Sequence, residues 1–281
     1  MDPAGSIALR RSNFSLMYLF RHLFVGVAMY FAAQVLHGQA PAIDDTAQPE
    51  RAWTITHAVT SQYLFRGVRL EGAAYQPSLD YTAGALSLGV WSSVALSDHH
   101  RGDADPEVDF YGAYSFSSSS GVFDVTPGVD IYTYPDADRS TGQYSATFEP
   151  SLAANILVSG IRFTPKIYYD LTLEGATVEL SAAYALPLTT LGTELDFSAS
   201  VGTFKWKSVT AGALPPEKNW GDYGLLSVSV PYQISAKGKA AINVTYSEGR
   251  NNFYKQAGYP KQPNEDAIGR VAVTLSYAIS Y

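Results

Sequence analysis

Apolar and polar residues alternate along most of this chain after its first fifty residues. The pattern is clearest at the end, where residues 268–281 read IGRVAVTLSYAISY. Val271, Val273, Leu275 and Tyr277 occupy every second position, and small or polar residues fill the positions between them. A period of two is typical of a β-strand with one apolar face. The segment exceeds the usual length of about five or six residues for a soluble strand, but it suits the roughly nine to eleven that cross a bilayer at a tilt.

The same alternation predicts twelve strands, at residues 53–67, 75–82, 85–96, 107–116, 122–134, 143–156, 161–170, 174–186, 193–204, 223–235, 239–247 and 268–281. Short connections rich in Gly, Ser and Pro alternate with connections that are mostly longer and polar. An even strand count with this alternation is typical of outer-membrane barrels. We therefore predict an all-β, transmembrane, antiparallel up-and-down β-barrel of about 12 strands over residues 53–281. An ordinary β-sandwich strand is the alternative interpretation of the last segment.

Three prolines fall inside the predicted strands, at Pro127, Pro150 and Pro165. Proline cannot donate a hydrogen bond to a ladder, and a closed barrel has no edge strand on which to place it. We therefore predict β-bulges at these positions. His57 lies on the predicted apolar face of the first strand, where a polar ring is unexpected.

The first 42 residues are typical of a secretory signal peptide. Arg10, Arg11 and Arg21 supply positive charge, an apolar run spans residues 23–36, and Ala40-Pro41-Ala42 is a small-residue cleavage pattern. We expect cleavage after Ala42, a periplasmic lead-in over residues 43–52, and insertion into the bacterial outer membrane. The terminal aromatic residue Tyr281 is typical of an assembly signal read by the barrel-assembly machinery. Met17 is an alternative start.

Composition narrows the class of protein and of partner. Of the 281 residues, 46% are hydrophobic and 16% charged, yet no apolar run of 18 follows the first forty residues. There is no cysteine, which excludes disulfides, thiol nucleophiles and cysteine-bound metals. The net charge of −7 argues against nucleic acid as a partner. We expect contact with outer-membrane lipid and lipopolysaccharide, and we predict no cofactor.

Five segments resemble the motifs of a known family, namely Ser61–Gly67 (SQYLFRG), Pro77–Tyr81 (PSLDY), Gly89–Ser93 (GVWSS), Glu107–Tyr114 (EVDFYGAY) and Tyr132–Pro135 (YTYP). Together they resemble the TorF-like porin family of Gram-negative bacteria. The similarity covers about residues 53–135 and is weak beyond them. It implies an outer-membrane barrel with no established substrate, and it implies no catalytic residues.

The polar face of the predicted strands would line the lumen of the barrel. Its acidic members are Asp80, Glu107, Asp109, Asp124, Asp130, Glu149, Asp170, Glu179, Glu194 and Asp196. Its basic members are Arg66, Arg162, Lys166, Lys239 and Arg270. The excess of acids would favour cations in a water-filled pore. The alternative is that these side chains form ion-pair networks that plug a narrow barrel.

These features predict a passive channel for small hydrophilic solutes that prefers cations. The alternative is a non-conducting structural or adhesive barrel, and a membrane enzyme is a distant third. His57 and Ser61 share a face, but at about 3.3 Å per residue they would lie about 13 Å apart, too far for proton transfer. The protein is therefore not predicted to be an enzyme.

Two groups of loop residues offer further candidate sites. Asp98, His99 and His100, with Asp103 and Asp105, carry side chains that can bind a divalent cation, although a solvated acidic loop is the favoured interpretation. Trp206, Trp220, Phe253, Tyr254 and Tyr259 fall in the two longest predicted loops. They could stack on sugars, but packing of the loops or contact with lipopolysaccharide is favoured.

Overall fold

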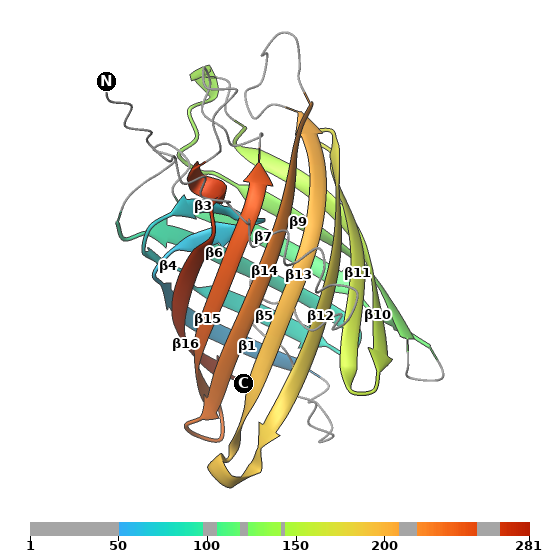
Figure 1. The fold of residues 1–281 in the computed structure, drawn as a ribbon, viewed down its shortest axis with the longest axis vertical. Coiled ribbons are helices and arrows are strands. Elements are labelled where there is room, and N and C mark those ends of the chain that lie inside the picture. The colour runs from blue at the N-terminus through green and yellow to red at the C-terminus, as the bar shows by residue number, and fades with distance from the viewer. Residues whose placement is uncertain (1–50, 98–105, 119–122, 142–143, 208–217, 252–264) are drawn as a thin grey trace, which may run out of the picture.

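A computed structural model of the protein describes residues 51–97, 106–118, 123–141, 144–207, 218–251 and 265–281. Its main sheet is antiparallel and closes on itself, so that the strands stand as a tilted ring (Figure 1). The sheet has fourteen strand segments, but two of the strands in the ring are each interrupted once, which leaves twelve wall strands. The predicted fold class, an all-β barrel of about 12 strands, is confirmed.

In order around the ring, the wall strands are β1 (Arg51–Thr60), β4 (Ala74–Tyr75) with β5 (Ser78–Ala83), β6 (Leu86–Ala95), β7 (Glu107–Tyr114) with β8 (Phe116–Ser117), β9 (Phe123–Thr133), β10 (Ala146–Val158), β11 (Ile161–Asp170), β12 (Gly175–Leu188), β13 (Thr193–Lys207), β14 (Lys218–Gln233), β15 (Gly238–Asn251) and β16 (Arg270–Ser280). Short 3-10 helices occupy η1 (Arg139–Thr141), η2 (Thr189–Leu191) and η3 (Glu265–Ala267). Within the described residues, no helix is long and apolar enough to cross a membrane.

The barrel closes where the last strand meets the first. β16 pairs with β1 from Thr54 opposite Ser280 to Thr60 opposite Thr274. Beyond this ladder, Trp53 and Tyr281 exchange two backbone hydrogen bonds, of 3.1 and 2.8 Å. The final residue of the chain is therefore part of the closing seam.

Removal of Tyr281 should lower the yield of folded barrel several-fold while export continues, because the deletion takes away both backbone bonds at the end of the seam. Heat-modifiable migration on gels would report the folded fraction. Tyr232→Ala is a matched control, since Tyr232 is another exposed aromatic side chain of a wall strand that takes no part in closure. An unchanged folded yield after deletion would contradict an assembly role for Tyr281.

Side chains of the wall strands divide by face as the alternation predicts. Large apolar side chains point outward and are exposed, for example Ile167 at 50% and Leu275 at 56%. Buried polar side chains such as Glu149, Asp109 and Ser181 point inward. An outward face of this kind is a liability in water, whereas a bilayer requires it.

The prediction of bulges at the three prolines was wrong. The β9–β10 ladder runs in one register through Pro127 and Pro150, and the β11–β12 ladder does so through Pro165. Pairs are missing instead from the ladder on the opposite side of each proline-containing strand. Pro127 of β9 faces the break between β7 and β8, and Pro165 of β11 has no paired residue on β10. Each backbone N–H points to only one neighbouring strand, so a proline removes one bond from one ladder and requires no extra residue.

The prediction of a first strand over residues 53–67 was wrong at its C-terminal end. β1 ends at Thr60, and Ser61 still bonds to β16: its N–H donates to Val273 O, and its Oγ accepts from Val273 N, both at 2.9 Å. The chain then folds into the barrel as a hairpin of β2 (Tyr63–Phe65) and β3 (Val68–Glu71), seen near the upper end of the ring in Figure 1.

We call residues 63–71 the internal hairpin. Tyr63 and Phe65 fall on the odd positions that carry the apolar side chains of β1, yet they are only 4% and 7% exposed, inside the barrel. All three residues of β2 are buried, but its two aromatic rings keep the same odd positions as the apolar side chains of β1. The period alone therefore does not show that the chain has left the wall.

Candidate functional site in the barrel lumen

The turn of the internal hairpin explains how its tip crosses the lumen. Phe65 pairs with Val68, and the two residues between them have positive φ, 45° at Arg66 and 81° at Gly67. Two positive φ values between paired residues define a type I′ turn, which favours glycine at its second position. A Cβ atom on Gly67 would lie 2.6 Å from Tyr223 Cβ and 3.0 Å from Gly249 Cα. The tip therefore packs closely against β14 and β15, and glycine is required there.

Arg66 anchors this tip to the far wall. Its Nη1 and Nη2 donate to Oε1 and Oε2 of Glu149 on β10, at 2.9 and 2.7 Å. The side chains of this pair are only 3% and 1% exposed. Tyr132 also donates its hydroxyl to Glu149 Oε2 at 3.0 Å. A bidentate pair shielded from water is among the strongest polar contacts available to a protein.

Aromatic rings surround the Arg66 guanidinium. Its Cζ lies 4.9 Å from the ring centre of Phe65, 4.8 Å from that of Tyr168 and 5.1 Å from that of Trp206. Burial alone would lower the pKa of Arg66, but Glu149 and the nearby tyrosine Tyr132 raise it well above its ordinary value. The guanidinium therefore keeps its charge, and both the carboxylate and the rings stabilise it.

The hairpin is the centre of an apolar cluster inside the barrel. The buried members of the cluster are Tyr63, Phe65, Val68, Leu70, Ala74, Trp91, Tyr132, Leu173, Phe204, Trp206, Tyr223 and Ala267. Burial raises the pKa of the Tyr63 phenol well above its usual value, so its hydroxyl stays neutral. The described side chains thus fill the lumen at the level of the hairpin.

The charged residues predicted to line the lumen fall into two groups. Buried around the hairpin are Arg66, Glu107, Asp109, Asp130, Glu149, Asp170 and Glu179. Half-buried elsewhere on the wall are Asp80, Asp124, Arg162, Lys166, Glu194, Asp196, Lys239 and Arg270. Arg66 lies on the hairpin and not on a wall strand, because β1 ends before it.

Tyrosines on the inward face bind several of these carboxylates. Tyr223 donates to Glu179 Oε2 at 2.6 Å, and Tyr111 donates to Asp80. Together with Tyr132 and Tyr168, they place four phenol rings in the lumen. The list of charged residues predicted to line the lumen did not include these tyrosines. The alternation does place Tyr111, Tyr132 and Tyr168 on the polar face of their strands.

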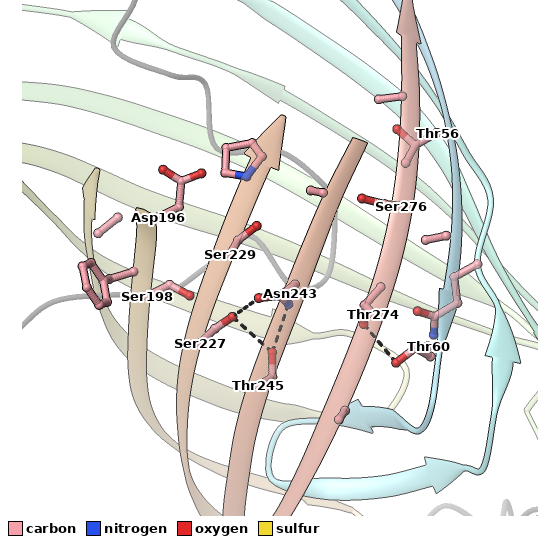
Figure 2. Close-up of a pocket in the computed structure, with 18 of the residues that line it drawn as sticks. Thr56, Thr60, Asp196, Ser198, Ser227, Ser229, Asn243, Thr245, Thr274 and Ser276 are labelled. Atoms are coloured by element: carbon pink, nitrogen blue, oxygen red, sulfur yellow. Dashed lines mark hydrogen bonds between the residues drawn. The ribbon is translucent and has the colours of Figure 1, made fainter. Parts of the chain in front are cut away.

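A cavity of about 260 Å³ lies between the internal hairpin and the end of the barrel that carries the short turns. Tyr63 and Leu64 of the hairpin contribute to its lining, as does Gly160 of the β10–β11 turn. One side of the cavity is a continuous surface of short polar side chains from β1 and β13–β16 (Figure 2). We call it the hydroxyl wall: Thr56, Thr60, Ser198, Ser227, Ser229, Asn243, Thr245, Thr274 and Ser276.

Hydrogen bonds connect the side chains of the hydroxyl wall, both within a strand and between neighbouring strands. Thr245 donates to Ser227 Oγ at 3.1 Å, Asn243 Nδ2 donates to Thr245 Oγ1 at 3.1 Å, and Thr274 and Thr60 share a bond of 3.0 Å (Figure 2). Sequence reasoning singled out charged residues and missed this neutral surface. The available signal was the dominance of Ser, Thr, Asn and Ala on the inward face of the last strands.

The structure places the remaining predicted candidate residues differently from one another. Residues 98–105, which hold the possible cation ligands, and the loop aromatics Phe253, Tyr254 and Tyr259 lie outside the described residues. Trp206 belongs to β13 and is buried against Phe204, with ring centres 4.2 Å apart, so it is not a loop platform for sugars. Trp220 is exposed on β14. The Nδ1 of His57 lies 2.6 Å from the hydroxyl of Tyr75, which gives the unexpected polar ring a partner.

Three solved structures have some similarity to this chain, and their descriptions name a porin, an outer membrane channel and LpxR. A KdgM porin in complex with disordered oligogalacturonate has a TM-score of 0.45 and 11% identity, over 82% of this chain and 99% of that one. The COG4313 outer membrane channel from Pseudomonas putida F1 has a TM-score of 0.49 and 8% identity, over 86% and 100%. LpxR from Salmonella typhimurium has a TM-score of 0.44 and 8% identity, over 80% and 99%. Similarity at this level says nothing about what this chain does.

None of the curated proteins matches the sequence. A family model described as a bacterial protein of unknown function, Gcw_chp, matches residues 46–195. The matched region contains all five motifs that resemble the TorF-like porins, although the family description itself names neither porins nor a function. It also contains the internal hairpin and Glu149, its partner on the wall. Because the match takes in more than half of the chain, this protein belongs to the Gcw_chp family of bacterial proteins.

Proposed function

We propose that the protein resides in the bacterial outer membrane, to which a signal peptide over residues 1–42 directs it. The outward face supports this proposal, because exposed aliphatic side chains such as Ile242 and Leu275 surround a barrel whose wall strands turn polar side chains inward. Exposed aromatic side chains, among them Trp53, Tyr114 and Tyr232, lie near the short-turn end. Such rings favour the level of lipid headgroups. Outer-membrane lipid, lipopolysaccharide and the barrel-assembly machinery are the partners that this location implies.

Within that membrane, we propose a channel for small hydrophilic solutes that the internal hairpin closes at rest. A single observation carries the proposal: a hydroxyl-lined cavity ends at a hairpin that is inserted in the lumen and is continuous with the wall only at its two ends. Barrels of about eight strands are filled by their own side chains, whereas those of sixteen or more leave open channels. A ring of intermediate size has room for an inserted segment, and moving that segment would open a passage.

The channel should prefer cations. Glu107, Asp109, Asp130 and Glu179 lie buried around the hairpin, where a passing solute would meet them, and Arg66 is already paired with Glu149. An excess of carboxylates at the narrowest part of a wet passage favours cations. Salt should weaken the preference, because ions screen the field over about 10 Å at 0.1 M.

Planar-bilayer recording would test both proposals. We expect small or infrequent openings from the intact protein. In a KCl gradient, the reversal potential should have the sign of the K⁺ equilibrium potential, and its magnitude should be smaller at higher total salt. A reversal potential of the sign that Cl⁻ gives would contradict the proposed selectivity. Complete absence of openings from protein shown to be folded by heat-modifiable migration, in the intact form and with the hairpin removed, would contradict the channel.

A non-conducting structural or adhesive barrel is the second candidate. The observation that favours it is the dense packing around the hairpin, where Arg66 and Glu149 are almost inaccessible to water. We propose no catalysis: Ser61 bonds to the backbone of Val273, and His57 contacts Tyr75, so the two side chains do not form a catalytic pair.

A further inference from the structure

We propose that the cavity beneath the internal hairpin binds a small neutral polyol of about the size of a monosaccharide. The inference rests on the proposed channel in that it names the class of solute that would enter its lumen. It starts from the chemistry of the hydroxyl wall, which differs from that of the charged region around the hairpin.

The hydroxyl wall offers hydrogen bonds without formal charge. Eight of its nine members are Ser or Thr, and the ninth is Asn243. A hydroxyl can both donate and accept, and it rotates to suit its partner. Polyols carry the same group at every carbon, so a wall of short hydroxyl side chains can exchange hydrogen bonds with a polyol in several orientations. Figure 2 shows these side chains on adjacent strands, with Ser229 and Ser276 facing the cavity.

Charge is confined to the margin of the cavity. Among the described residues that line it, only Asp196, Arg162 and Lys239 are charged. All three lie near the short turns, within a few residues of the beginning of β13, β11 and β15. An ion held along the middle of the hydroxyl wall would lose hydration without gaining a counter-charge, and that loss is costly. The cavity therefore favours a neutral solute, although the hairpin region above it is acidic.

The size of the cavity limits the solute. Its volume of about 260 Å³ lies just below the roughly 300–1,000 Å³ of pockets that hold drug-sized ligands. The space exists because the inward residues on this side are short, including Ala58, Ala241 and Ala278. A monosaccharide suits this volume better than an oligosaccharide does, as long as the hairpin closes one end.

Equilibrium binding of D-glucose to the intact, folded protein in lauryldimethylamine-oxide micelles would test the inference, because this detergent carries no sugar. Saturation-transfer NMR would detect binding, and succinate and L-lysine would serve as charged probes of similar size. The test variant removes three wall hydroxyls with Ser227→Ala, Thr245→Val and Thr274→Val. The control is Thr177→Val, since Thr177 is buried on the inward face, its hydroxyl has no partner, and it does not line the cavity.

We expect the intact protein and the Thr177→Val control to bind glucose alike. The three-site variant should bind it more weakly by on the order of tenfold or more, since three hydrogen-bonding groups are lost. Equal binding by the three-site variant, or preference for succinate or L-lysine, would overturn the inference. Binding at equilibrium does not require conduction. A barrel that binds glucose but never conducts would overturn only the channel, and one that conducts but binds no polyol would overturn only this inference.

Discussion

Replacement of Tyr63–Glu71 by a Gly-Ser link is expected to raise the conductance of the barrel several-fold. The deletion removes the four apolar side chains that the hairpin contributes to the cluster in the lumen, as well as Arg66. It should leave the wall intact, because Tyr63 N already lies 3.2 Å from Gly72 O, so the cut ends are neighbours. Water would then reach the acids on β7, β9, β10 and β12, and the passage should become more selective for cations.

Planar-bilayer recording of the deleted and intact proteins would measure the change, with heat-modifiable migration as the test of folding. The matched control is Tyr63→Phe, which keeps the full hairpin and its packing in the lumen and removes a single hydroxyl. It should conduct like the intact protein, because the apolar part of the hairpin remains. Equal conductance of the intact and deleted proteins would show that the hairpin does not close the lumen.

Breaking the buried ion pair from either side should release the hairpin. Arg66→Asn leaves the Glu149 carboxylate buried with Tyr132 as its one donor among the described residues, and Glu149→Gln leaves the guanidinium without its carboxylate. Removal of one partner of a buried pair typically costs about 3–5 kcal/mol. We expect either single variant to lower the free energy of hairpin undocking by about this amount, and the double variant by clearly less than the sum.

Tryptophan fluorescence in urea would follow this step, because the rings of Trp91 and Trp206 are buried against the hairpin, with Trp91 5.4 Å from Tyr63. Undocking should shift the emission to longer wavelength at lower urea than barrel unfolding does. Tyr223→Phe provides a control, since it removes a hydroxyl bonded to Glu179 in the same region but leaves the pair intact. Strictly additive effects of the two substitutions would contradict a direct coupling between Arg66 and Glu149.

The pattern of apolar residues does not reveal the internal hairpin. Trp53, Ile55 and Val59 on β1 and Tyr63 and Phe65 on β2 all fall on odd positions, so the period of two does not change where the chain leaves the wall. A strand against lipid and a strand buried in a protein core can both place large apolar side chains at every second position. Arg-Gly also lacks the Asn or Asp that usually marks a type I′ turn.

The sequence by itself determined the ring. Residues 161–170 were predicted as a strand with the bounds that β11 has, and the alternation placed Glu149, Glu179 and Asp196 on the inward face, because a strand with lipid on one side must repeat every two residues. Only the tertiary structure decided what fills the lumen. Arg66 and Glu149 are 83 residues apart in the chain, and the hydroxyl wall combines residues from both ends of it. No local period records such contacts, since they depend on which side chains meet after the ring has closed.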